Sequence, residues 1–231
     1  MLLQLQSQSQ YVLAVMLWAV ASAGYAAEPR VVHEETEWCS IRVPAANDSK
    51  LPRVLLVGDS VCNGYYDKVA KELKGKAHIA KLATSASLGD PALLDQMKLL
   101  LANYDFAVIH FNNGLHGFDY IDEEYGRDIH ELLQIVRQHA PLAKLIWATS
   151  TPVRKKAPNL EEFDKENAIV KSRNRIVVNV ATKHQIPIND LYSLVENHPE
   201  YWKDDGVHFK PEGQVIQAKQ VVKHILDASG E

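Results

Sequence analysis

From about residue 51 onward, short apolar runs alternate with longer amphipathic segments. The runs are almost continuously apolar, as expected for strands of a sheet that helices cover on both faces. This alternation is typical of βα units and predicts an α/β domain with three layers, α/β/α, around a central parallel sheet of about five strands. The predicted strands are Val54–Val57, His78–Ala83, Phe106–Phe111, Leu145–Ala148 and Ile186–Ile188.

Three of the intervening segments have the apolar spacing of a helix. The first covers residues 121–140 and ends before a proline, which cannot continue a helix. The second has Asn159 and Glu162 at the spacing of a capping box, which predicts that a helix begins there. The third has Pro211 in its first turn and runs to the end of the domain.

Length and charge narrow the function classes. The chain has 231 residues, 46% of them hydrophobic and 23% charged, which suits one well-packed domain. A formal charge of −4 and the lack of any Lys/Arg-rich run argue against a nucleic-acid partner. We assign residues 51–231 to the α/β domain and residues 28–50, which have no clear period, to a lead-in segment that wraps onto it. The sequence does not indicate an oligomeric state.

Residues 1–27 contain no charged side chain, and their apolar stretch is followed by small residues suited to cleavage. We interpret this segment as a signal peptide, because a membrane span needs about 20 apolar residues and this stretch is shorter. The lack of Lys or Arg before the stretch is atypical, and an uncleaved anchor or a buried helix is the alternative. We therefore expect a secreted or periplasmic protein without stable membrane insertion.

Cys39 and Cys62 are the two cysteines of the chain. In an oxidising compartment they could form one disulfide, and two buried free thiols are the equal alternative. Neither has the clustered Cys and His neighbours of a zinc site, so we expect no metal there.

Ser60 follows directly on the first predicted strand, in the triplet Gly58, Asp59, Ser60. Ligands of open parallel sheets bind beyond the carboxyl ends of the strands, where the N-terminus of the next helix offers N–H groups. A serine placed there could act as a nucleophile and could use its own N–H as an oxyanion donor. Gly, Asp and Ser are also ordinary loop residues, and Asp59 is most simply a turn residue that accepts backbone N–H groups.

A serine nucleophile needs a base, and that base needs a third group to orient it. Asp205 and His208 form a DxxH element immediately before the last predicted helix, and they could supply both groups. The alternative is that His208 makes structural hydrogen bonds at the helix entry while Asp205 forms a turn.

Together, the GDS and DxxH motifs resemble those of the SGNH, or GDSL-like, hydrolases over roughly residues 52–226. The resemblance implies a flavodoxin-like fold, ester hydrolysis, and no metal or other cofactor. It also implies that Ser60 is the nucleophile, His208 the general base and Asp205 the residue that orients His208.

Two inner motifs depart from the family pattern. Where the family has GxND, this chain has GLH, so the resemblance places His116 at the position of the oxyanion-hole Asn. A histidine N–H can donate to an oxyanion as an amide does. The alternative donors are Asn112 and Asn113. The second donor, a backbone N–H after the second strand, is assigned to Ala86, with Gly89 as second choice.

Asn113 and Trp202 are candidate substrate contacts, although Trp202 could equally be a core aromatic. We expect a small-molecule or carbohydrate ester as substrate, and a secreted domain without an obvious lid favours a carbohydrate O-acetylesterase over a lipase or thioesterase. A non-catalytic glycan- or lipid-binding domain with a decayed oxyanion hole is the competing interpretation. The intact set of Ser60, Asp205 and His208 opposes it.

Overall fold

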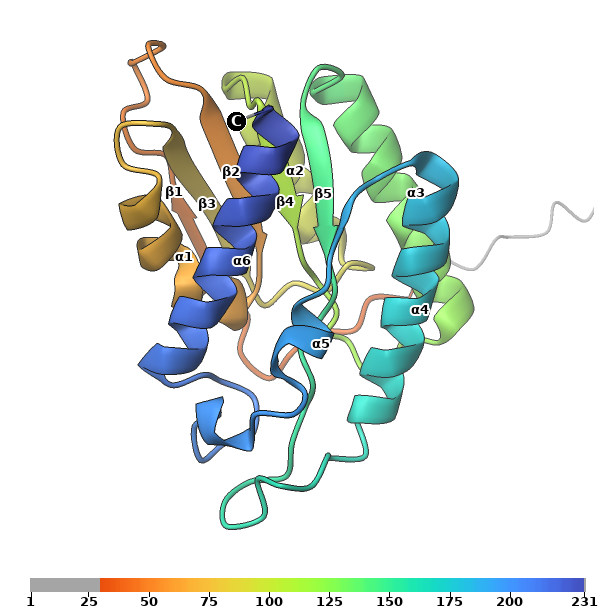
Figure 1. The fold of residues 1–231 in the computed structure, drawn as a ribbon. Coiled ribbons are helices and arrows are strands. Elements are labelled where there is room, and N and C mark those ends of the chain that lie inside the picture. Colours follow the sequence, from red (N-terminus) through yellow and green to blue (C-terminus); the bar gives the residue numbers. More distant parts are fainter. Residues whose placement is uncertain (1–29, 231) are drawn as a thin grey trace, which may run out of the picture. The chain divides into compact units, whose positions relative to one another are not determined.

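A six-stranded sheet runs through the middle of the domain, with helices on both faces (Figure 1). The computed structural model describes residues 30–230, so the predicted signal peptide, residues 1–27, lies outside them. The strand order is β1-β3-β2-β4-β5-β6, and every neighbouring pair except β1 and β3 is parallel. The strands are β1 (Cys39–Arg42), β2 (Arg53–Gly58), β3 (His78–Thr84), β4 (Val108–Phe111), β5 (Lys144–Ala148) and β6 (Ile188–Asn189).

The five strands expected from apolar runs correspond to β2 through β6, and the three-layer α/β prediction is confirmed. The sixth strand, β1, comes from the lead-in segment and pairs antiparallel with β3, with Cys39 opposite Thr84 and Arg42 opposite Lys81. Most of β1 is exposed at the sheet edge, so it has no apolar run by which the sequence could reveal it.

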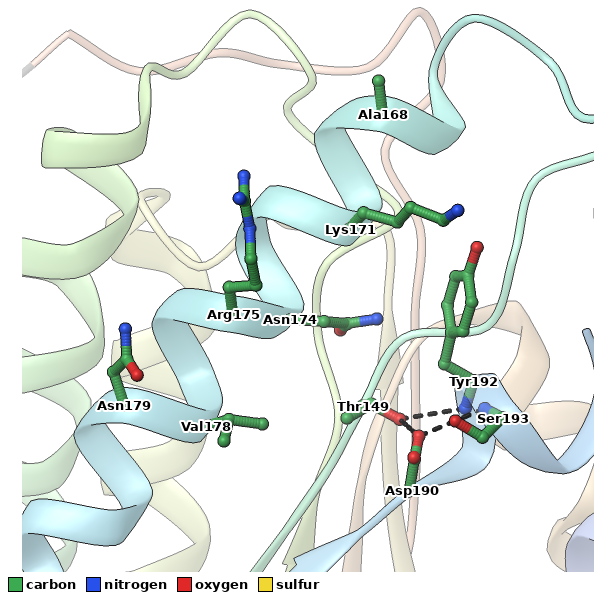
Figure 2. Close-up of a pocket in the computed structure, with 10 residues that line it drawn as sticks. All are labelled: Thr149, Ala168, Lys171, Asn174, Arg175, Val178, Asn179, Asp190, Tyr192 and Ser193. Carbon is green, nitrogen blue, oxygen red and sulfur yellow. Dashed lines mark hydrogen bonds between the residues drawn. The ribbon is translucent and has the colours of Figure 1, made fainter.

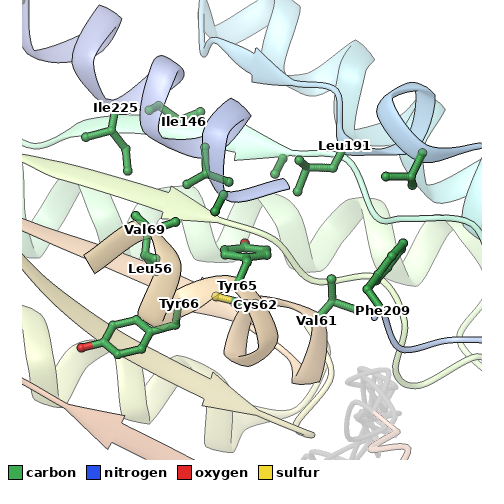
Figure 3. Packing of buried hydrophobic residues seen from close by; sticks show 14 of the residues in the cluster. Leu56, Val61, Cys62, Tyr65, Tyr66, Val69, Ile146, Leu191, Phe209 and Ile225 are labelled. Carbon is green, nitrogen blue, oxygen red and sulfur yellow. The ribbon is translucent and has the colours of Figure 1, made fainter. Parts of the chain in front are cut away.

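Helices α1, α5 and α6 pack on one face of the sheet, and α2, α3 and α4 pack on the other. Figure 3 shows the first of these two cores, where Tyr65 and Val69 of α1 meet Leu56 of β2 and Ile225 of α6. Burying each such side chain contributes about 1.5 to 3 kcal/mol. The helices are α1 (Ser60–Glu72), α2 (Pro91–Asn103), α3 (Asp122–His139), α4 (Asn167–His184), α5 (Leu191–Val195) and α6 (Pro211–Ser229), with a 3₁₀ turn η1 (Pro199–Tyr201).

The start of α4 differs from the prediction. The capping box expected at Asn159 and Glu162 is absent, and α4 begins at Asn167. The physical reason is a contact of Arg154. Its guanidinium donates to the backbone carbonyls of Leu160 and Glu161 at 2.9 and 3.2 Å. Those carbonyls would otherwise be acceptors of the first helical turn. The starts of α3 and α6 agree with the predicted ones to within a residue.

Cys39 and Cys62 are both free thiols, so the disulfide alternative is wrong; of the alternative of two buried free thiols, only Cys62 is buried. Cys39 is exposed on β1, whereas Cys62 is buried in α1 between the helix and the sheet. Burial raises the pKa of the Cys62 thiol to about 12, which keeps it protonated at neutral pH. Among residues 30–230, no helix is both long and apolar enough to cross a membrane.

Candidate active site

Ser60 is the first residue of α1 and lies where β2 ends. Asp59 is the N-cap of this helix, and its buried carboxylate accepts a 2.8 Å hydrogen bond from the Val61 N–H. The structural interpretation of Asp59 is therefore confirmed. Gly58 lets α1 approach this closely, because a Cβ there would lie 2.5 Å from Cβ of Cys62. The Ser60 N–H is at the first helical position, where an α-helix offers no acceptor of its own.

The structure brings Ser60, His208 and Asp205 into one chain of hydrogen bonds, although 148 residues separate Ser60 from His208. The Ser60 Oγ lies 2.9 Å from Nε2 of His208, and Nδ1 of His208 lies 2.9 Å from Oδ2 of Asp205. A carboxylate only accepts, so His208 donates through Nδ1–H and presents the lone pair of Nε2 to the serine hydroxyl. This is the tautomer that a general base requires.

Asp205 is itself held by the backbone of its own turn. Its Oδ1 accepts from the N–H of Val207 at 2.9 Å and of His208 at 2.8 Å. Partial burial opposes ionisation, but these bonds and the His208 ring together lower the pKa of Asp205. The lowered pKa favours the ionised form of Asp205, which is the form that accepts from Nδ1–H of His208.

The DxxH turn, residues 203–208, is closed from both sides. Trp202 and Phe209 face each other as an antiparallel bridge, with ring centroids 4.5 Å apart. Gly206 has φ +74° and packs against the backbone of Arg154, where a Cβ would lie 2.2 Å from the carbonyl oxygen. The Gly206 carbonyl in turn accepts a 2.8 Å bond from the Arg154 N–H. Glycine is required here for both conformation and space.

A pocket of about 240 Å³ opens beside the nucleophile. Two side-chain amides at its wall are held by lysines: Lys81 donates to Asn63 at 2.5 Å and Lys68 donates to Gln214 at 2.7 Å. A pocket of this size accommodates a short acyl group better than a fatty chain. Its lining residues are Ser60, Val61, Asn63, Gly64, Lys203, His208, Phe209 and Gln214.

His116 lies in the loop after β4, and its side chain is largely buried, with 17% exposed. Nδ1 of the ring lies 3.1 Å from Oε1 of Glu34. Burial raises the pKa of Asp59, and among the opposing influences the charge of His116 is the largest, ahead of that of His208. The assignment of His116 to the oxyanion hole by the GLH motif stays a prediction.

Arg173 of α4 binds the backbone of the His116 loop. Its side chain is 1% exposed, and its guanidinium donates to the carbonyls of Gly114 at 3.1 Å, His116 at 2.7 Å and Gly117 at 2.5 Å. Burial lowers the pKa of Arg173, but no carboxylate is needed here because the three carbonyls supply its acceptors. One long-range side chain therefore shapes the whole GLH segment.

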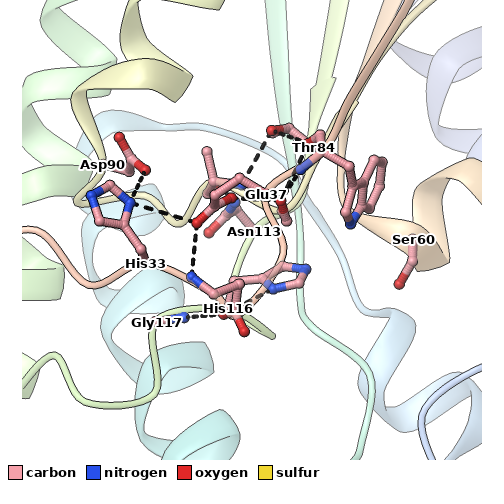
Figure 4. A network of polar contacts seen from close by, with 12 residues as sticks. His33, Glu37, Ser60, Thr84, Asp90, Asn113, His116 and Gly117 are labelled. Atoms are coloured by element: carbon pink, nitrogen blue, oxygen red, sulfur yellow. Dashed lines mark hydrogen bonds and ion pairs between the residues drawn. The ribbon is translucent and has the colours of Figure 1, made fainter.

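The lead-in segment forms a strap, residues 31–38, over the loops that follow β3 and β4 (Figure 4). Val32 N–H donates to the hydroxyl of Tyr120 at 2.8 Å, and Trp38 N–H donates to that of Ser85 at 2.7 Å. Ser85 also donates to Glu37 at 2.6 Å. The predicted wrapping of the lead-in is thus seen for residues 31–38, and this strap covers the two loops assigned to the oxyanion hole.

Ala86 is buried in the loop after β3, and its N–H donates to Oγ1 of Thr84 at 3.1 Å. An oxyanion would have to share or replace this acceptor. Gly89, the second choice, packs tightly against Tyr120 and Asp128, where a Cβ would lie 2.7 and 2.6 Å from their nearest atoms. The assignment of the second donor to Ala86 stays a prediction.

The two predicted substrate contacts are wrong. Trp202 is 0% exposed and lies between Phe209 and the guanidinium of Arg154, so its alternative role as a core aromatic is confirmed. Asn113 is 2% exposed, and its amide donates to the Ala86 carbonyl at 3.1 Å. Asn113 therefore links the loop after β4 to the loop after β3, and its side chain is buried. Asn112, the other alternative donor, is likewise occupied, because its amide donates to the carbonyl of the last residue of β5 and to that of the residue after it.

A larger groove, of about 700 Å³, lies between α4 and α5 and does not include Ser60 (Figure 2). Its polar floor is internally paired: Thr149 donates to Asp190 at 2.9 Å, and Asp190 accepts from the Ser193 N–H at 3.1 Å. Asn174 makes two bonds to the backbone of Ser150. These polar groups hold the ends of β5 and β6 in place, so we do not assign chemistry to this groove.

Among the described residues, His33, Glu37 and Asp90 form a trio whose potential metal-binding atoms all lie within 4.8 Å of one another. Nδ1 of His33 lies 3.4 Å from Asp90 and 3.6 Å from Glu37. Each carboxylate has another protein partner, because Asp90 caps α2 and Glu37 binds Ser85. The trio is explained as a polar anchor of the strap.

Two residues of this site were missed by sequence reasoning. Arg173 falls between Val170 and Val177 on the apolar face of its helix, and a charged residue in such a position is a signal of a buried polar contact. Glu34 has no comparable signal, because the strap has neither helical nor strand periodicity.

Comparisons with known proteins identify the family. The family model described as the GDSL-like Lipase/Acylhydrolase family matches residues 56–216, which include Ser60 and the whole DxxH turn. Among curated proteins, none matches the chain.

Several solved structures share the fold. A GDSL-like lipase from Bacteroides thetaiotaomicron superposes with a TM-score of 0.61 at 19% identity, covering 76% of this chain and 88% of its own. A carbohydrate acetylesterase family member from Sinorhizobium meliloti gives 0.61 at 15% identity, with 78% and 100% covered. A carbohydrate esterase family 3 structure from Talaromyces cellulolyticus gives 0.63 at 14% identity, also with 78% and 100% covered.

Proposed function

The chain belongs to the GDSL-like lipase/acylhydrolase family, and we propose that it is a serine esterase whose nucleophile is Ser60. The observation that carries the proposal is the hydrogen-bonded chain from Asp205 through His208 to Ser60, with both distances at 2.9 Å. This geometry lies within the reach required of a nucleophile and its base.

In the proposed reaction, Ser60 Oγ attacks the ester carbonyl carbon while Nε2 of His208 takes the hydroxyl proton. The carbonyl π electrons move to oxygen, and the oxyanion is held by N–H donors at the start of α1 and in the covered loops. Collapse of this intermediate expels the alcohol, which takes the proton from His208 and leaves an acyl-Ser60. A water molecule then attacks the acyl carbon, His208 takes its proton, and the acid is released as the proton returns to Ser60.

We propose a short-chain acyl ester, and within that class an acetyl ester of a carbohydrate, as the substrate. The pocket of about 240 Å³ beside Ser60 supports a short acyl group over a lipid chain. Two structures of the same fold carry names of carbohydrate acetylesterases or carbohydrate esterases, which makes sugar esters the first substrates to assay.

The test compares wild type with Ser60→Ala on p-nitrophenyl acetate, p-nitrophenyl octanoate and acetylated polysaccharide. Removal of the nucleophile should lower kcat at least about 10³-fold, because triad members act as a unit. Ser40→Ala, on β1 and away from the triad, is the matched control. Equal turnover by wild type and Ser60→Ala would exclude the assignment. A fluorophosphonate probe adds a substrate-independent readout, because it should label the peptide that contains Ser60.

If neither wild type nor Ser60→Ala hydrolyses any of the esters and the probe labels neither, the result would instead favour the glycan- or lipid-binding alternative. Octanoate turned over faster than acetate would favour a lipase.

We further propose that residues 1–27 are removed as a signal peptide and that the enzyme acts outside the cytoplasm. The charge-free N-terminus with small residues near position 27 supports this location. N-terminal sequencing of the protein from the periplasm or the medium should give a start close to residue 28, and an intact Met1 would contradict it.

A further inference from the structure

His116 and His208 have similar carboxylate neighbours but are needed for opposite tasks. Each has Nδ1 against a carboxylate, 3.1 Å from Glu34 for His116 and 2.9 Å from Asp205 for His208. A carboxylate in this position selects the Nδ1–H tautomer and leaves a lone pair on Nε2 of the neutral ring. That lone pair suits a base such as His208, but an oxyanion donor must carry a proton at Nε2.

We propose that Glu34 is a positioning residue that orients His116 for the oxyanion hole and makes it donate as an imidazolium, with Nδ1–H bound to Glu34 and Nε2–H directed at the oxyanion. This inference rests on the proposed esterase function. It assigns a role to the lead-in segment, which lies outside the part of the chain matched by the family model.

The geometry of Glu34 supports positioning. The same Oε1 that faces His116 also accepts the Gly117 N–H at 3.1 Å, so the carboxylate holds both the ring and the backbone beside it. Glu34 is fixed in turn, because its own N–H donates to Glu37 at 2.8 Å. In the view of Figure 4, the edge of the His116 ring that is paired with Glu34 faces away from Ser60.

The charged groups that face His116 come from the strap, the β2–α1 turn and α4. Glu34 and Glu37 face it from the strap, and Asp59 lies at the β2–α1 turn. The attraction of His116 opposes the effect of burial at both Glu37 and Asp59, but the pKa of Glu37 is lowered whereas burial still raises the pKa of Asp59. Arg173 of α4 is the cation on this side, and it binds the main-chain oxygen of His116 at 2.7 Å. Three carboxyl groups therefore face the imidazole, while the guanidinium is directed at the backbone.

An imidazolium donor is a stronger oxyanion ligand than a neutral amide, because charge-assisted hydrogen bonds are roughly twice as strong. It also makes the hole dependent on pH. The rate should fall on the alkaline side as His116 loses its proton, in addition to the fall on the acid side when His208 is protonated.

The kinetic test measures pH profiles of kcat and KM for wild type, Glu34→Gln and Glu35→Gln. Gln at position 34 keeps an oxygen that can accept from the ring but removes the charge. We expect the alkaline limb of kcat to move about one pH unit toward acid, which lowers kcat about ten-fold on that limb, with KM changed less than about two-fold. Glu35 is exposed on the same strap, so Glu35→Gln is the matched control and should keep the wild-type profile.

His116→Asn provides the second arm, because it places the neutral amide of the family pattern at this position. The variant should lose the alkaline limb, and Glu34→Gln added to it should have no further effect on the profile. A Glu34→Gln profile identical to that of Glu35→Gln, or an equal effect of Glu34→Gln with and without His116, would overturn the proposal.

Nitrogen-15 NMR of histidine-labelled protein tests the positioning without any activity. His116 is assigned by the signal lost in His116→Asn, and at neutral pH both of its ring nitrogens should carry a proton in wild type. A ring protonated at only one nitrogen would overturn the proposal, even if Ser60 is confirmed as nucleophile. Absence of Ser60-dependent hydrolysis would overturn the proposed function instead.

Discussion

The proposed base, His208, and the proposed oxyanion donor, His116, are supported in contrasting ways. Asp205 and His208 lie three residues apart, and the turn that carries them is closed by its own backbone and by the neighbouring pair Trp202 and Phe209. His116 depends on distant segments instead, since Arg173 shapes its loop from α4 and Glu34 binds its ring from the strap.

This difference indicates which substitutions should affect the Asp205–His208 turn and which should affect the His116 loop. A local turn needs only its own few residues to be correct, whereas a loop held by remote side chains requires the strap and α4 to be in place first. We therefore expect substitutions in the base turn to abolish chemistry with modest effects on its surroundings. Substitutions of residues that support the His116 loop should lower both kcat and the free energy of unfolding.

The largest expected effect is that of Asp205→Asn. The amide keeps the size of the side chain but can donate to Nδ1 of His208, which favours the wrong tautomer. We expect kcat to fall about 10³- to 10⁴-fold with little change in Tm. Steady-state kinetics on a short-chain ester and thermal unfolding measure the two quantities. Asp204→Asn, at the exposed neighbouring position, should leave both unchanged. A fall in kcat of less than ten-fold would contradict this contrast between the base turn and the His116 loop.

Gly206→Ala tests whether the base turn is self-contained. Its Cβ would lie 2.2 Å from the Arg154 carbonyl, so the turn must shift and carry His208 away from Ser60. We expect kcat to fall about 100-fold, in line with the sensitivity of triads to displacements of about 1 Å. Gly75→Ala is matched in conformation, with φ +82° against +74°, but its Cβ would meet nothing within 4 Å. That control should lose only about 1 to 2 kcal/mol of stability, with kcat unchanged.

Arg173→Lys tests the remote support of the His116 loop. A lysine keeps the charge but cannot reach three carbonyls with a planar fork, which leaves buried acceptors unpaired. We expect about 2 to 4 kcal/mol of lost stability together with a roughly 30-fold lower kcat. Chemical unfolding and kinetics at the same pH provide the measurements. Arg175→Lys, two residues along the same helix at the groove of Figure 2, is the control. Loss of kcat without loss of stability would contradict this assignment.

The smallest effect concerns β4, the strand that leads into the His116 loop. His110 is fully buried, and burial lowers its pKa to about 3, below the ordinary 6.5 of the unfolded chain. The unfolded state therefore binds a proton more readily, and stability is lost as pH falls from 6.5 toward 3. Between pH 7.5 and pH 5 the loss from this residue should be about 2 kcal/mol.

Urea unfolding at the two pH values measures that loss. His110→Gln has no titrating ring, so its stability should change less between pH 7.5 and pH 5 than that of wild type, whatever its stability at pH 7.5. His130→Gln, at an exposed position of α3, should retain the wild-type difference. Equal differences in wild type and His110→Gln would show that His110 does not contribute.

Prediction from sequence succeeded where a feature is local. The apolar runs identified β2 through β6 because parallel strands are buried on both faces, and the GDS and DxxH motifs marked Ser60, Asp205 and His208 by their places at strand and helix ends. It failed where partners are distant. Strand β1 is largely exposed, α4 begins at Asn167 because Arg154 engages the preceding carbonyls, and Trp202 is buried by contacts that no spacing reveals.

By itself, the sequence determined the α/β class, the family pattern and the three residues proposed for nucleophile, base and orienter, because periodicity and short motifs are properties of neighbouring residues. Only the tertiary structure decided which side chains support them. The ion pair between His116 and Glu34 and the hydrogen bond from Arg173 to the Gly114 carbonyl join residues 82 and 59 positions apart. Such contacts depend on how strands and loops are arranged in space, and no local pattern in the chain encodes them.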